Sequence, residues 1–207
     1  MEVKVAQRVQ RSSEISDAER VAARNVISAF DKFLKQLWAA RQHDQRLVNV
    51  LQKNKEADPA SLFEIRHLLR RFQKEVRNRY ANLIILFAGK KDVKSGEPVS
   101  TGYIHILDPF TKDTITRQIK SALQDAVQQL TEFMEEFLEA FEDFNSPDQI
   151  TKIISTSKKA GQIVQSIENI VDNQLKPHFE KNILTRKKIS MIRGGIRRRS
   201  RIIDMLG

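Results

Sequence analysis

The stretch IKSALQDAVQQLTEFMEEFLEAFEDF, residues 119–144, carries the clearest structural pattern in the chain. Its apolar residues recur in alternating steps of four and three, which is the heptad spacing of a helix that packs along its length against other helices. The pattern is sustained for over three heptads. The positions are Ile119, Leu123, Ala126, Leu130, Phe133, Phe137, Ala140 and Phe144.

Additional apolar residues make this stripe wider than a simple coiled-coil seam. Met134, Leu138 and Phe141 extend it around the helix. A helix with so broad an apolar face contacts two neighbours, either in the core of a bundle or between subunits. We therefore predict a helix-packing or oligomer interface at Leu130, Phe133, Phe137, Phe141 and Phe144.

Helix-start signals and further apolar periods flank this segment. Ser16 and Glu19 form a capping box, and Pro147 follows a capping serine in a short turn. A turn this short makes the helices on its two sides antiparallel. The predicted fold is all-α: an elongated four-helix bundle, or paired helical hairpins with a coiled-coil-like seam. The predicted helices cover about 17–54, 59–88, 113–145 and 147–176.

Between the second and third helices, residues 89–110 break the helical pattern. They are rich in Gly, Ser and Pro, which indicates a small hairpin or a long loop, and Tyr103–Leu107 is predicted to be a short strand. Pro177 is expected to kink or break the fourth helix near its end. The resulting organisation is an N-terminal arm at 1–15, a helical domain at 16–180 and a basic C-terminal arm at 181–207.

Charge is strongly segregated along the 207 residues, whose formal net charge is +10. Residues 121–151 hold eight acidic side chains and no Lys or Arg, so the acidic helix at 113–145 is a possible site for a protein partner. The C-terminal arm holds nine basic side chains and one acidic one. Clustered cations neutralise phosphates and release counterions, which gives affinity for DNA or RNA without sequence preference. The predicted nucleic-acid-binding residues are Arg186, Lys187, Lys188, Arg193, Arg197, Arg198, Arg199 and Arg201.

The arm also supports other interpretations, because aliphatic residues are interleaved with its cations. It can dock on the acidic helix of a neighbouring subunit, as in a structural assembly protein of a virion or other large complex. It can instead lie on an anionic membrane surface, as a membrane-surface adaptor does, or remain a solvated tail. Self-association is expected in the first two readings of the chain, nucleic-acid binding and assembly.

A second basic region precedes and enters the 89–110 segment. It is either the solvated face of the second helix or a further contact with nucleic acid. Its residues are Arg66, Arg70, Arg71, Lys74, Arg77, Lys90 and Lys91.

Signatures of catalysis are missing from the sequence. There is no cysteine, Gly89-Lys90-Lys91 lacks the other residues of a phosphate-binding loop, and Glu64 with His67 makes only one of the two Glu-x-x-His motifs of a di-metal site. We expect a non-enzymatic protein with no metal and no cofactor. No apolar run reaches 18 residues and the N-terminal residues are charged, so we expect a cytoplasmic or virion protein that is neither secreted nor transmembrane.

Overall fold

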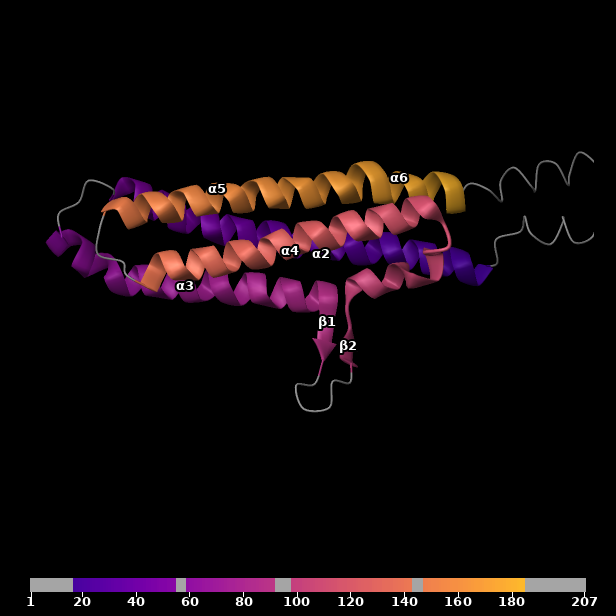
Figure 1. Ribbon diagram of the computed structural model, residues 1–207, viewed down its shortest axis with the longest axis horizontal. Coiled ribbons are helices and arrows are strands. Elements are labelled where there is room, and N and C mark those ends of the chain that lie inside the picture. Colours follow the sequence, from indigo (N-terminus) through magenta and orange to yellow (C-terminus); the bar gives the residue numbers. More distant parts are fainter. Residues whose placement is uncertain (1–16, 55–58, 92–97, 143–146, 185–207) are drawn as a thin grey trace, which may run out of the picture.

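The computed structural model describes residues 17–54, 59–91, 98–142 and 147–184. Four long helices account for most of them: α2 (Asp17–Lys53), α3 (Pro59–Ala88), α4 (Thr114–Glu142) and α5 (Pro147–Ile170). Consecutive helices run in opposite directions and lie side by side in an elongated array (Figure 1). Each contacts the next in the chain, and α5 also contacts α2, so the four close around one core. The fold is all-α apart from one two-stranded sheet, and we call the described part the helical body.

Local sequence explains where the helices begin and end. Asp17 and Glu19 occupy the first turn of α2, where carboxylates favour the positive end of the helix dipole, and Lys53 occupies its last turn. The Asn54 side chain donates a 2.8 Å hydrogen bond to the carbonyl of Val50 and so satisfies a terminal acceptor. At the start of α4, the carboxylate of Asp113 accepts the backbone N–H of Thr116 at 2.8 Å, which is the geometry of an N-cap.

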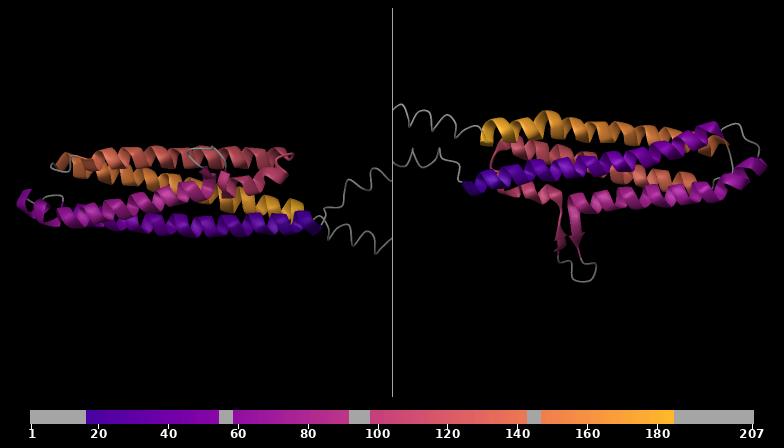
Figure 2. Two further views of the ribbon diagram at one scale, coloured as in Figure 1. Left: turned by 90° about the horizontal axis from the view of Figure 1, so that it is seen from below. Right: turned by 180° about the vertical axis from the view of Figure 1, so that it is seen from behind.

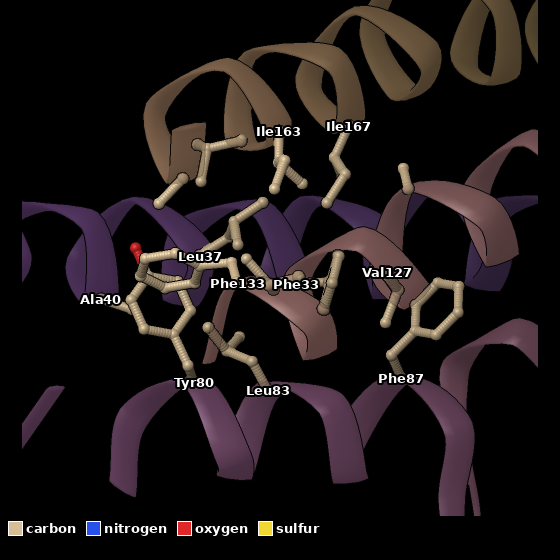
Figure 3. Close-up of a cluster of buried hydrophobic side chains, with 14 of the residues drawn as sticks. Phe33, Leu37, Ala40, Tyr80, Leu83, Phe87, Val127, Phe133, Ile163 and Ile167 are labelled. Atoms are coloured by element: carbon tan, nitrogen blue, oxygen red, sulfur yellow. The ribbon is translucent and has the colours of Figure 1, made fainter. Parts of the chain in front are cut away.

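The core is built from the apolar faces of all four helices. Phe33 and Leu37 of α2, Tyr80 of α3, Phe133 of α4 and Ile163 of α5 meet in one buried cluster (Figure 3). The rings of Tyr80 and Phe133 meet edge to face at 5.2 Å, an arrangement that aromatic quadrupoles favour. The heptad positions of α4 within the described range are all buried: Ile119, Leu123, Ala126, Leu130, Phe133, Phe137 and Ala140.

A hairpin follows α3 and projects sideways from the body (Figure 2). Strand β1 (Gly89–Lys91) pairs antiparallel with β2 (Pro98–Thr101), with Gly89 opposite Thr101. Gly89 has a φ of +87°, and a Cβ there would lie 2.5 Å from the carbonyl oxygen of Ser100. Only glycine satisfies both constraints, so this position ends α3 and turns the chain into the sheet.

The prediction of a strand at Tyr103–Leu107 was wrong, because these residues belong to the 3₁₀ helix η1 (Tyr103–Phe110). The buried members are Ile104 and Leu107, which lie three residues apart. Residues i and i+3 share a face in a 3₁₀ helix, whereas they face opposite sides of a strand. Tyr103 packs against Phe33 of α2 and Phe110 against Phe179, so η1 closes one side of the body.

Of the two outcomes predicted for Pro177, a kink or a break, the break does not occur, although the regular α-helical geometry changes on both sides of this residue. The chain continues from α5 through η2 (Val171–Leu175), α6 (Lys176–His178) and η3 (Phe179–Leu184). Both η2 and η3 are π-helical, and the N–H of Lys176 donates to the carbonyl of Val171 five residues earlier. Wider π turns accommodate a proline that cannot donate and whose ring crowds the preceding turn. The helix therefore ends at the same end of the body where α2 begins (Figure 1).

Candidate nucleic-acid interface

Four basic residues of the second predicted region lie on one face of α3. Arg66, Arg70, Lys74 and Arg77 follow one another at steps of four, four and three, which aligns them along the helix. They span about 16 Å at 1.5 Å per residue. Arg66 is half-buried and the other three are exposed. We call these four residues the α3 basic stripe.

No member of the α3 basic stripe forms an ion pair with another residue that the structure describes. Arg71, which lies beside the stripe, is paired with Glu75 at 3.3 Å. Like charges three and four residues apart on a helix repel one another, so the stripe costs stability as it stands. An anion lying along α3 would remove that cost.

Two arginines, one from each helix, lie near His43 where α3 meets α2. Glu75 lies 3.7 Å from the ring of His43, and Arg79 and Arg46 lie near the same ring. Burial lowers the pKa of His43, and the charges of Arg79 and Arg46 lower it further, against the opposing effect of Glu75. His43 is therefore held towards its neutral form by burial first and by the neighbouring arginines second.

The hairpin continues the basic region beyond the end of α3. Lys90 and Lys91 lie in β1, where the Lys90 side chain is exposed and its backbone N–H donates to the Oγ of Ser100 at 3.1 Å. The hairpin and the α3 basic stripe thus belong to one continuous segment, with the hairpin projecting at its end (Figure 1).

The predicted binding residues of the C-terminal arm lie outside the described residues, as does Phe144. The structure places the point where the arm leaves the body. Leu184 ends η3, and the ion pair of 2.5 Å between Lys176 and Asp31 fixes this part of the chain against the start of α2. The residues outside the described range are Arg186, Lys187, Lys188, Arg193, Arg197, Arg198, Arg199 and Arg201.

Helix α4 carries a group of acidic residues that lie on its outward side. Asp125, Glu132, Glu135 and Glu139 are exposed. Glu136 is partly exposed and pairs with Lys159 of α5 at 2.7 Å. The aromatic residues predicted to form an interface, Phe133, Phe137 and Phe141, are buried in the body together with Leu130. The apolar face of α4 therefore packs against the other helices, and its acidic face is exposed to solvent.

One buried polar cluster was not anticipated from the sequence. Asp44 is fully buried in α2 and accepts a hydrogen bond from Arg41, which also donates to the Oγ of Ser157 at 2.9 Å. Burial raises the pKa of Asp44 despite the opposing effects of Arg41 and Ser157, and burial followed by the charge of Asp44 raises the pKa of Tyr80. The burial of Asp44 could have been predicted from the helical spacing, because this spacing puts Asp44 on the apolar side. The positions are Leu37, Ala40, Asp44, Leu47 and Leu51.

Two histidines of the described residues make structural contacts. His178 contacts the carboxylate of Asp113 at 2.9 Å and the Oγ of Thr116 at 3.2 Å, so it joins the capping network of α4. His105 contacts Asp108 at 3.1 Å within η1. Across the described ranges, no three His, Asp or Glu side chains come together as metal ligands would.

Comparisons with family models, with curated proteins and with solved structures give no match to this chain. Among the described residues, no helix has the length and apolar character needed to cross a bilayer.

Proposed function

We propose that this chain is a non-enzymatic, oligomeric protein, an elongated four-helix bundle that binds nucleic acid through its Arg-rich C-terminal arm. The role would be packaging, scaffolding or loading of another protein on DNA or RNA. The observation that carries the proposal is the concentration of positive charge: the α3 basic stripe has no ion-pair partner in the described chain, and the sequence of residues 181–207 adds nine cations against one acid.

The binding would be electrostatic and largely independent of sequence. Each cation that neutralises a phosphate releases a condensed counterion, and this release supplies most of non-specific affinity. Arginine is well suited to the task because its planar guanidinium holds phosphate oxygens through two parallel hydrogen bonds. The arm has no aromatic residue from 181 to 207, so base stacking is not part of the proposal.

Removing the arm tests the proposal directly. We expect a chain ending at Thr185 to lose at least about tenfold in affinity for a labelled 20-base-pair duplex in low salt, since a large share of the phosphate contacts goes with it. Fluorescence anisotropy gives the affinity, and circular dichroism checks that the helical body remains folded. Equal affinities of the full and shortened chains would contradict the proposal.

A second candidate function follows from the exposed acidic face of α4. The arm of one copy docking on α4 of the next would make the chain a structural assembly protein, joined head to tail. Loss of oligomers on removing the arm, with nucleic-acid affinity unchanged, would favour this function over the first. Sizing of the same two chains by light scattering separates the two cases.

A further inference from the structure

A shallow groove of about 350 Å³ runs between α4 and α5. Phe133 and Ile163 form the apolar part of its lining, and both belong to the buried cluster in Figure 3, with Ile163 keeping 9% exposure and Phe133 2%. Glu132 and Glu136 stand along its α4 edge. The remaining residues that line it are Gln129, Lys159, Gln162 and Ser166.

The groove lining holds two carboxylates and one ammonium group, that of Lys159, so it carries one negative charge in excess. Glu132 is exposed and accepts only a 3.4 Å hydrogen bond from Gln128, while Glu136 pairs with Lys159. Like-charged residues occur four apart, Glu132 with Glu136 and Glu135 with Glu139, and such pairs destabilise a helix. A cationic occupant would offset this repulsion, and an occupant with aliphatic side chains would also cover the apolar part of the lining.

One segment of the chain has both properties. The C-terminal arm interleaves its cations with aliphatic residues that include Ile189, Ile192, Ile196, Ile202 and Ile203. We propose that the groove between α4 and α5 is the docking site of this arm in the same molecule, with an arginine on Glu132 and isoleucines over the apolar lining at Ile163.

The arm is long enough to make this contact. The α5 side of the groove, residues 159–166, lies 18–25 residues before Leu184 along one continuous helix, or about 27–38 Å at 1.5 Å per residue. Arg197 follows Leu184 by 13 residues, which span up to about 45 Å when extended. A tether of this length holds the arm at an effective concentration in the millimolar range, which favours its own groove over that of another copy.

Docking on α4 would compete with the binding of nucleic acid to the arm. The same arginines cannot hold carboxylates and phosphates at once, so nucleic acid would have to displace the arm from α4. This part of the inference rests on the proposed function, whereas the docking contact itself does not.

A spin label on the arm detects the docking contact. The chain contains no cysteine, so Ser200→Cys provides a single attachment site. In low salt we expect a nitroxide there to broaden the amide signals of Gln129, Phe133, Ile163 and Ser166 in isotope-labelled protein, and 0.5 M salt to restore them, because the Debye length falls to a few ångströms. No selective broadening would overturn the inference. Mixing labelled chains with separate spin-labelled chains must leave the signals sharp, since broadening in the mixture would place the arm on a second copy.

A matched pair of variants tests the groove edge. Glu132→Gln removes a carboxylate that lines the groove, whereas Glu135→Gln removes one from the same helix three residues away, outside the groove lining. We expect Glu132→Gln to weaken the broadening and to raise affinity for the duplex by about two- to fivefold, the range of one exposed ion pair. Glu135→Gln should leave the broadening unchanged, and equal effects of the two variants would contradict docking in this groove.

Signal broadening tests the docking contact and duplex binding tests the proposed function, so the two results are independent. Broadening without any binding to the duplex would support the docking contact and refute nucleic-acid binding. Binding to the duplex without broadening would support the proposed function and refute the docked arm.

Discussion

Single residues show where the sequence pattern is informative and where it misleads. The buried Asp44 occupies a position in α2 where the heptad register calls for an apolar residue, and it is held there by Arg41 and Ser157. A carboxylate in a core is tolerated only when its hydrogen-bond partners come with it. Gly161 of α5 lies beside this group, where an added Cβ would come within 3.0 Å of the Arg41 guanidinium. The sequence identifies the register, but it cannot identify Ser157, which lies 116 residues after Arg41, as the partner of this pair.

We predict that Asp44→Ala lowers the free energy of unfolding by about 2–3 kcal/mol, because it leaves the Arg41 charge unpaired at the edge of the core. The side chain of Arg41 retains 14% exposure, which keeps the loss below that of a fully buried pair. Replacing both residues, as Arg41→Met with Asp44→Leu, should cost much less than Asp44→Ala alone. Urea unfolding measures all three proteins, and a larger loss in the double variant would contradict this account of the pair.

Among the elements, the long helices were predictable and a hairpin after α3 was one of the two predicted alternatives, whereas η1 and the π turns were not predicted. The four ranges predicted from capping signals and apolar periods correspond to α2, α3, α4 and α5, because a strongly periodic segment has one way to bury its apolar face. The 3₁₀ helix η1 was mistaken for a strand, since a run of aliphatic residues fits either geometry until its burial is known. The π turns around Pro177 depend on packing against α2 and on the Asp31–Lys176 ion pair, which lie far away in the sequence.

The start of α4 offers a test at this scale. Asp113 caps the helix and contacts His178, so Asp113→Ala should lower the free energy of unfolding by about 1 kcal/mol, while Asp113→Ser keeps a capping oxygen and should lose less. Burial works against ionisation of Asp113, but hydrogen bonds from Thr116 and the charge of His178 outweigh it and lower the pKa of the carboxyl.

The sign of the pH dependence follows from that lowered pKa. A carboxyl with a lower pKa in the folded state stabilises the fold fully above its unfolded value of about 3.9, and this contribution is lost as the pH falls through and below that value. The stability gap between the natural chain and Asp113→Ala should therefore shrink from pH 6 to pH 3. A gap that stays constant or widens in thermal melts over this range would contradict the capping role.

At the scale of the whole molecule, the chain separates its charges between elements. The α3 basic stripe and the acidic face of α4 each carry one sign, and residues 185–207 hold eight cations and one acid. The composition indicated this separation, and the structure adds that the α3 stripe and the α4 acids are exposed on different helices and do not neutralise one another in the described chain. The apolar pattern of the sequence predicted that one face of α4 is packed, and this face contains the buried Leu130, Phe133, Phe137 and Phe141. The residues that they contact on other helices could be identified only from the structure.

The measurement that tests the central claim most directly is the salt dependence of binding to a generic duplex. For contacts with phosphates, the logarithm of affinity falls against the logarithm of salt with a slope near −0.9 for each phosphate neutralised. We predict a slope steeper than about −4 for the full chain and a much shallower one for the chain ending at Thr185. Lys74→Gln with Arg77→Gln should reduce the slope by about one to two, while the control pair Lys32→Gln with Lys35→Gln, exposed on α2 at the same spacing, should leave it unchanged. Binding that does not depend on salt, or no binding at 20 mM salt, would contradict the account.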